Sequence, residues 1–187
     1  EEVDDLFGAD LSDIDSDVLF EKDDYLFVKN VTKSGISIDV LVKFENLENI
    51  ISLLHESPFV EMDSNGWENY RIIHGITEMC DSRGNLPDEM GLIKLVSNDK
   101  GCYPGQEIHA RLESRGRKIK SLCRLIGDSP VSLGKQNVPE FGTISISTAI
   151  FSNGQALALA LIKMGNSTSE FIHIEGNDYN IEIIGYP

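Results

Sequence analysis

The sequence lacks a long hydrophobic run, an initiating methionine and a paired cysteine motif. No apolar stretch approaches the roughly 20 residues that a membrane-spanning helix needs. The N-terminal segment does not combine the basic, apolar and small residues of a signal peptide. We therefore expect a soluble protein that is not addressed to a membrane. Because the chain begins with Glu1, we also expect an N-terminus that was processed, trimmed or engineered.

The three cysteines, Cys80, Cys102 and Cys123, are widely spaced, and no two of them form a CxxC pair. This pattern fits neither a disulfide framework nor a self-contained zinc site. It predicts a reducing compartment, which is the cytoplasm, or the mitochondrial matrix in a eukaryote. Cys123 alternates with strand residues and is expected to pack in the core. His74 and His109 have no second ligand at a recognisable spacing, so we predict no metal site.

The formal net charge of −15 argues against unspecific binding to nucleic acid, whose phosphates require a basic surface. The charge is uneven along the chain. Residues 1–24 contain eleven acids and the single base Lys22, whereas residues 100–124 contain seven Lys or Arg and only two acids. A local basic patch of this kind usually faces an anion. The alternative interpretation is a solvated helix face with balancing acids nearby.

The first part of the chain predicts an α+β domain. Alternating apolar residues on both sides of a Lys-Ser-Gly turn predict a β-hairpin from residues 19–31 and 36–42. Apolar spacings of three and four predict a helix at 44–55. Ser64 is a good N-cap for a second helix, which Gly75 ends. Three further predictions are a loop at 80–86, a short helix at 90–96, and a helix from Pro104 to about Gly116 with Ile108 and Leu112 facing the core.

From residue 119 the apolar periodicity changes to two. Strands are predicted at 118–126, 142–146, 155–164, 170–174 and 179–184, with turn-rich segments between them. Short antiparallel strands without helices indicate a small barrel or sandwich. The chain is therefore predicted to consist of an acidic lead or loop at 1–17, an α+β part at 18–117 and a small antiparallel β-barrel at 118–187.

Residues 100–107, Lys-Gly-Cys-Tyr-Pro-Gly-Gln-Glu, combine several residue types with separate physical uses. Gly101 and Gly105 permit backbone geometry that a Cβ would forbid. Cys102 precedes a predicted helix start, where free N–H groups and the positive end of the helix dipole would stabilise a thiolate. Lys100 adds a positive charge nearby. The alternative is that Cys102 is a small buried apolar residue and Lys100 an ordinary surface lysine.

Three stretches together resemble the YgfZ family. They are Trp67-x-x-Tyr70-Arg71-x-x-x-Gly75, the segment Asn85-Leu86-Pro87-Asp88-Glu89-x-Gly91-Leu92, and residues 100–107 followed by Arg111 and Gly116. The last stretch matches the family's Lys-Gly-Cys-(Tyr or Phe)-x-Gly-Gln-Glu signature without a mismatch, and the middle one is similar to the family's Leu-Pro-x-Glu. The resemblance extends over about residues 18–187 and is strongest from 67 to 125.

The resemblance implies a fold related to the glycine-cleavage T-protein: a partial ferredoxin-like, aminomethyltransferase-type domain followed by a small barrel. It implies tetrahydrofolate in a central channel, and a role in assembling or maintaining iron–sulfur clusters in enzymes such as bacterial tRNA-thiolating ones. By motif match, Lys100 and Cys102 are the residues on which function is expected to depend. The residues implied in folate binding are Tyr103, Gly105, Gln106, Glu107, Arg111, Glu89 and Trp67.

Members of this family usually carry about another hundred residues ahead of the hairpin, which is most of a domain. The chain is thus expected to be a fragment, a shortened homologue with a truncated folate site, or a chain that completes its fold by pairing, for example as a homo-oligomer. The acid used for aminomethyl transfer in the T-protein belongs to that region. Aminomethyltransferase activity is therefore not expected.

The leading hypothesis is an accessory factor that serves iron–sulfur enzymes or assembly proteins, with Cys102 as a redox-active or transiently cluster-bound thiolate and the basic patch holding a folate polyglutamate tail. A first alternative is a tetrahydrofolate-dependent one-carbon transferase that uses Asp88 or Glu89. A second is a module that docks on tRNA or on an RNA-modifying protein. That docking would use Arg111, Arg115, Arg117, Lys118 and Lys120. Direct nucleic-acid binding is not favoured, because exposed aromatics do not interleave with these bases.

Overall fold

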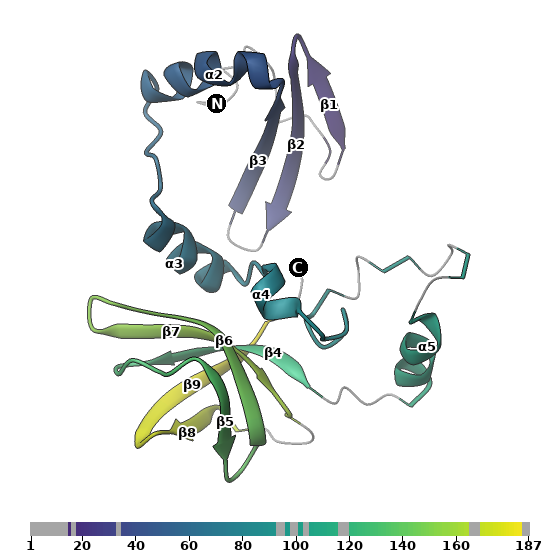
Figure 1. Ribbon diagram of the computed structural model, residues 1–187, viewed down its shortest axis with the longest axis vertical. Helices are drawn as coiled ribbons and strands as arrows, with labels where there is room; N and C mark the ends of the chain where they lie inside the picture. The colour runs from purple at the N-terminus through teal and green to yellow at the C-terminus, as the bar shows by residue number, and fades with distance from the viewer. Residues whose placement is uncertain are drawn as a thin grey trace. The chain divides into compact units, whose positions relative to one another are not determined.

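The computed structural model describes residues 15, 18–32, 35–92, 96–97, 101–102, 105–115, 120–164 and 169–184. The chain divides into two compact units, Glu1–Asp63 and Ser64–Tyr186, and each is described by itself. The fold is α+β with two antiparallel sheets, in agreement with the predicted class (Figure 1). The predicted domain boundary near residue 117 stays a prediction. The predicted acidic lead lies almost entirely outside the described residues.

A three-stranded antiparallel sheet with the order β1-β2-β3 forms the first unit. The predicted strand at 19–31 is two strands, because Asp23 and Asp24 form a turn in which Asp23 adopts a φ of 54°. No glycine marks this turn, so the sequence pattern did not reveal it. The elements of the unit are β1 (Leu19–Lys22), β2 (Tyr25–Thr32), β3 (Gly35–Val42), the 3₁₀ turn η1 (Phe44–Asn46) and α2 (Leu47–His55).

One face of this sheet carries a small apolar core. Phe27 is 1% exposed, and four partly buried residues pack against it: Phe20, Tyr25, Ile38 and Val40. Phe20, Phe27 and Val40 lie opposite one another in the register, and Tyr25 and Ile38 are two positions along from this row, on the same face of the sheet. In α2, Ile50 is the buried residue.

No helix in the described part of the chain is long and apolar enough to cross a membrane.

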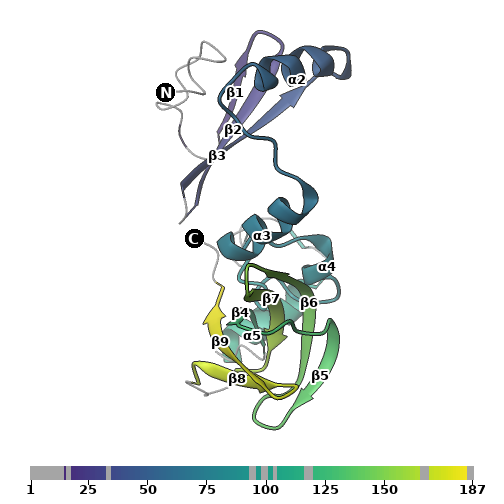
Figure 2. The same ribbon diagram turned by 90° about the vertical axis from the view of Figure 1, so that its left-hand side faces the viewer.

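The second unit contains a six-stranded antiparallel sheet that curls on itself (Figures 1 and 2). Its strand order is β5-β6-β7-β4-β9-β8. Sequence periodicity found every strand except β5, whose Gly-Lys-Gln-Asn-Val sequence has no apolar alternation. The strands are β4 (Ser121–Gly127), β5 (Gly134–Val138), β6 (Gly142–Ser152), β7 (Gln155–Ile162), β8 (Phe171–Ile174) and β9 (Asn177–Ile183).

Both faces of the central strand β7 are buried, and its sequence shows how. The alanines of Ala156-Leu157-Ala158-Leu159-Ala160-Leu161 belong to the core inside the curl, whereas the leucines belong to a second core on the outer face. Small side chains suit the concave inner side, where neighbouring strands converge. Larger ones reach the layer that covers the outer side, to which Ile72 and Met90 contribute. This alternation fixes which face of the sheet receives the helical layer.

The helices of the second unit are α3 (Ser64–His74), α4 (Met79–Ser82) and α5 (Gln106–Arg115). The predicted extent of α3 is confirmed, because the helix begins at Ser64 and ends before Gly75, although Ser64 is its first residue and not its N-cap. The predicted loop at 80–86 is wrong in its first part, because α4 forms one helical turn there. The predicted helix at 90–96 is not present in residues 90–92, where a turn at 87–91 ends, and 93–95 are not described. Ile108 is 51% exposed, so it does not face the core as predicted.

Gly75 ends α3 in a way that only glycine permits. Its φ is +68°, and a Cβ added there would lie 2.7 Å from the side chain of Ile184. The backbone N–H of Ile76 then donates to the carbonyl of Arg71 at 2.8 Å, which satisfies a helix-end acceptor. The close approach lets the end of α3 lie against the chain just after β9.

We predict that Gly75→Ala destabilises the protein more than Gly154→Ala. Both glycines have positive φ values, +68° and +76°, but a Cβ at Gly154 would meet no atom within 4 Å. Backbone strain alone costs about 1 kcal/mol, and the clash with Ile184 adds to it only at Gly75. Urea unfolding of both variants measures the difference. Equal losses would contradict the role assigned to the contact with Ile184.

Candidate functional site

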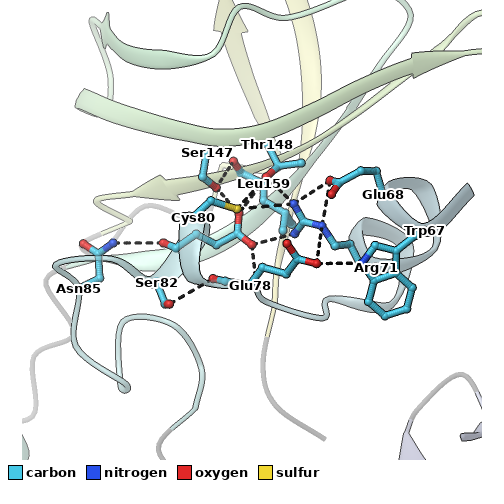
Figure 3. A network of polar contacts seen from close by, with 11 residues as sticks. Trp67, Glu68, Arg71, Glu78, Cys80, Ser82, Asn85, Ser147, Thr148 and Leu159 are labelled. Carbon is cyan, nitrogen blue, oxygen red and sulfur yellow. Dashed lines mark hydrogen bonds and ion pairs between the residues drawn. The ribbon is translucent and has the colours of Figure 1, made fainter. Parts of the chain in front are cut away.

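Arg71, in the middle of α3, is the most extensively bonded side chain in the described part of the chain, although it is only 1% exposed. Its Nη1 donates to Asp81 Oδ2 at 2.8 Å, and its Nη2 donates to Thr148 Oγ1 at 2.6 Å. Its Nε donates to Glu68 Oε2 at 2.9 Å (Figure 3). One guanidinium therefore joins α3, α4 and strand β6. We call Arg71, Glu68, Asp81, Ser147 and Thr148 the Arg71 network.

The carboxylate of Asp81 is the second centre of this network, and its side chain is completely buried. Its Oδ1 accepts hydrogen bonds from Ser147 Oγ at 2.5 Å and from Thr148 Oγ1 at 3.1 Å. Its Oδ2 also accepts the backbone N–H of Glu78 at 2.9 Å, which completes a capping box at the start of α4. No buried side-chain nitrogen or oxygen in the described residues is left without a partner.

A β-bulge in β6 presents two consecutive hydroxyl groups to Asp81. Ile146 pairs with Ala160 and Thr148 with Leu159, so Ser147 is the extra residue between them. In a regular strand, neighbouring side chains point to opposite faces. The bulge breaks this rule and turns Ser147 and Thr148 towards the same carboxylate, as bulges near functional sites often do.

Opposing electrostatic effects act on Arg71. Burial by itself would lower the pKa of its guanidinium, but the hydrogen bonds and charges of Glu68 and Asp81 outweigh this effect and raise the pKa above its ordinary value. Arg71 therefore stays charged and stays bound to its partners. It acts as a fixed structural cation and is not available to bind an anionic ligand.

The strip of α3 next to Arg71 carries a row of aromatic rings. The ring of Trp67 stacks on that of Tyr70 with 6.0 Å between centroids, and Tyr70 meets His74 edge to face at 4.2 Å. Trp67 is 41% exposed, and its Nε1 donates to Glu78 Oε1 at 2.8 Å, which holds the indole in one orientation. A half-exposed, oriented indole is suited to stack on a planar ligand.

Cys80 touches the Arg71 network, which sequence reasoning did not foresee. Its Sγ lies 3.8 Å from Arg71 Nη2 and 3.7 Å from Thr148 Oγ1. Cys80 is nonetheless exposed, whereas Cys123 is fully buried in strand β4. Burial raises the pKa of Cys123 to about 12, so its thiol stays neutral. The prediction that Cys123 packs in the core is confirmed.

Residues 85–92 form a turn that closes over the outer face of the curled sheet. Glu89 Oε2 accepts the backbone N–H of Leu86 at 3.2 Å, and the carbonyl of Glu89 accepts the N–H of Leu122, at the start of β4, at 2.8 Å. Met90 is 2% exposed and packs with the leucines of β7. The carboxylate of Glu89 thus supports its own turn, which makes it a weak candidate for a catalytic acid.

The predicted site at 100–107 is described in part. Lys100 and Tyr103 lie outside the described residues. Cys102 is exposed and lies four residues before the first residue of α5, Gln106. Gly105 has a φ of +93°, as the predicted need for glycine requires. Two further predicted site residues, Glu107 and Arg111, are exposed on α5.

Arg124, one of the seven basic residues at 100–124, is bonded within the fold. Arg124 Nε donates to Glu182 Oε2 at 3.0 Å, and its Nη1 donates to the carbonyls of Ile72 and Ile73. A cation at the last carbonyls of α3 is favourable because the C-terminal end of a helix is electronegative. Arg124 therefore anchors the end of α3 to β4. Of the bases proposed for docking, Arg111 is exposed and Lys120 half-buried, while the side chains of the other three are not described.

Trp67, Arg71 and Glu89 thus lie in one helical layer on the curled sheet, while no hydrogen bond or ion pair in the described residues joins Cys102 to Trp67 or Glu89. The described residues contain no group of three or more His, Cys, Asp or Glu that could hold a metal ion.

One signal for the Arg71 network was present in the sequence: a charged residue between Tyr70 and Ile72 needs a buried partner. The partner of Arg71 on β6, Thr148, is 77 residues away and could not be identified in advance.

The comparisons with known proteins agree with the resemblance. No protein-family model matches the chain. It is 33% identical over 129 residues to the "tRNA-modifying protein YgfZ" of Aliivibrio fischeri strain MJ11, covering 62% of this chain and 39% of that protein. It is 31% identical over 131 residues to the protein of the same name in strain ES114, with the same coverage. The chain thus spans well under half the length of these relatives.

We predict that Arg71→Met lowers the free energy of unfolding by about 3–5 kcal/mol, because Asp81 would be left as an unpaired buried charge. Arg124→Met is the control: its partner Glu182 is 49% exposed, so the loss should stay near 1 kcal/mol. The double variant Arg71→Met/Asp81→Leu should recover part of the loss, because no unpaired charge remains. Urea unfolding measures all three. A loss for Arg71→Met no larger than for Arg124→Met would contradict the importance of the network.

Proposed function

We propose, from its confirmed resemblance to the YgfZ proteins, that this chain serves in tRNA modification as an accessory factor and not as the modifying catalyst. The observation that carries the proposal is the sequence similarity itself, together with the complete Lys-Gly-Cys-Tyr-Pro-Gly-Gln-Glu signature at 100–107. The relatives are named for tRNA modification. An accessory role is favoured because the carboxylates of this layer, Asp81 and Glu89, are bound to their own surroundings.

The more specific role is assistance to iron–sulfur enzymes through Cys102. The exposure of Cys102 supports this role, because a thiolate that binds the iron of a cluster in transit must be reachable by a partner protein. The first turn of α5 follows closely, and Lys100 is two residues away in sequence. Cys80 and Cys123 are less suitable: the first contacts the Arg71 network and the second is buried and neutral.

Tetrahydrofolate is the cofactor that we infer for this role, with its planar pteridine against the aromatic row of α3. Trp67 supports the inference because it is half-exposed and held in orientation by Glu78. The glutamate tail of the cofactor would be attracted by the basic residues after Cys102, among them Arg111. Tyr103, Gly105, Gln106 and Glu107 would shape the segment between the two. The ferredoxin-like arrangement inferred for residues 18–117 belongs to the same proposal.

We predict that tetrahydrofolate quenches the fluorescence of the chain in a saturable manner, because Trp67 is its single tryptophan. Trp67→Ala should weaken binding in calorimetry about tenfold, since stacking on an aromatic ring is worth about 1–3 kcal/mol. Phe151→Ala is the matched control, because Phe151 is similarly exposed, at 48%, but lies on β6. A flat titration of the unmodified chain would rule out the folate part of the proposal.

We predict that Cys102→Ser abolishes the function of the chain in cells while Cys80→Ser preserves it. Serine has nearly the same size as cysteine but cannot supply a thiolate, so the substitution separates chemistry from packing. The measurement is the level of thiolated tRNA in a strain that lacks the chromosomal copy and carries each variant. The unmodified chain sets the upper reference. If Cys102→Ser restored tRNA modification as well as the unmodified chain, the role of Cys102 would be disproved.

A further inference from the structure

The three-stranded sheet of the first unit has a second face that none of the contacts described above uses. Phe27 and its neighbours occupy the other face. Because side chains alternate along a strand, the remaining residues of β1, β2 and β3 project from this second face. The register places two rows of opposed residues across it, Leu19–Val28–Asp39 and Glu21–Leu26–Leu41.

Four of the six residues in these two rows are aliphatic, and two of the four are open to solvent. Leu19 is 59% exposed and Leu41 is 52% exposed, while Val28 and Leu26 are half-buried between them. Adjacent exposed aliphatic side chains that form a patch, unlike scattered single ones, usually mark a site of interaction. Each row ends in a carboxylate, Asp39 on β3 in the first row and Glu21 on β1 in the second.

A groove of about 270 Å³ lies at one end of the face. Its floor is aliphatic, formed by Leu26 and Leu41 of the second face, and acids line it at and near the β1–β2 turn: Glu21, Asp23 and Asp24. Lys43 also lines it, and its Nζ pairs with Asp24 at 2.9 Å. Glu21 and Asp23 have no ion-pair partner among the described residues. The groove therefore combines an apolar floor with a net negative rim.

The charge of the rim determines which occupants fit. A nucleic acid or an anionic cofactor would be repelled by the carboxylates of Glu21 and Asp23. A second copy of the chain is disfavoured, because joining two such faces would bring acids against acids on molecules that each carry a net charge of −15. A basic polypeptide with aliphatic side chains satisfies both the floor and the rim. The eleven acids among residues 1–24 would also speed its approach.

We propose that this groove docks a basic, aliphatic segment of a partner protein. Aliphatic side chains of the segment cover Leu26 and Leu41, and its lysine or arginine side chains pair with Glu21 and Asp23. The long stems of lysine and arginine can lie along the apolar floor while their charged ends reach the rim. The groove shares no lining residue with the segment around Cys102 or with the aromatic row of α3, so the proposed recognition of a protein does not depend on folate.

The test uses the full chain and a short synthetic peptide in which lysine and leucine alternate. Nitrogen-15 NMR should show shifts concentrated at the amides of Glu21, Leu26 and Leu41, and the shifts should diminish when salt is added. A peptide in which glutamate replaces lysine is the control for charge and should produce no shifts. Shifts confined to the second unit, or equal shifts with the glutamate peptide, would overturn the proposal.

Two variants distinguish the contributions of floor and rim. Leu41→Ser should weaken peptide binding about fivefold or more, because the apolar area buried by a leucine side chain is lost. Leu133→Ser, which changes a comparably exposed leucine in the second unit, should leave binding unchanged. Glu21→Lys alters an exposed charge without touching the apolar core and should also weaken binding. If sedimentation shows dimers that Leu41→Ser dissociates, a second copy occupies the groove and the assignment to a basic partner is wrong.

Discussion

The second unit depends on the buried ion pair between Arg71 and Asp81. Transferring two charges from water to a protein interior is costly, and only close geometry with additional hydrogen bonds compensates for it. Both conditions are met, because Glu68 and Thr148 complete the guanidinium and the hydroxyl groups on β6 complete the carboxylate. An apolar contact could hold α3 and α4 on the sheet in several registers. The ion pair permits one register, because a shift of either partner would leave a buried charge unpaired.

This constraint determines what α3 presents to solvent. Arg71 and Ile72 are buried, and helical periodicity places Trp67, four residues before Arg71, on the neighbouring strip together with Tyr70 and His74. Glu78 bonds to both groups, since its carboxylate holds the indole of Trp67 and its backbone N–H donates to Asp81. The aromatic row proposed to bind the ligand is therefore connected to the Arg71 network through Glu78.

The sequence predicted those elements that depend on residues close together in the chain, and it did not predict those that depend on contacts between distant residues. Local signals were sufficient for α3, which begins at Ser64 and ends before Gly75, and for strands with clear alternation such as β7. The strand β5 was missed because its position depends on pairing with β6 and not on its own pattern. The Arg71 network was missed because its partners meet only after the sheet has formed and the bulge at Ser147 has turned two hydroxyls inward. The signature at 100–107 could be recognised as a motif, but its sequence did not reveal that Ile108 would be exposed.

The charges that sum to −15 are distributed unevenly over the two units. The acids near the N-terminus and the bases after residue 100 belong to different compact units. Among these bases, Arg124 is bound to its own surroundings, because it donates to Glu182 and to the carbonyls at the end of α3. At the acidic end, Lys43 neutralises only Asp24. The two ligands that we propose, an anionic cofactor for the second unit and a basic protein for the first, have opposite charges, so neither is attracted to the surface proposed for the other.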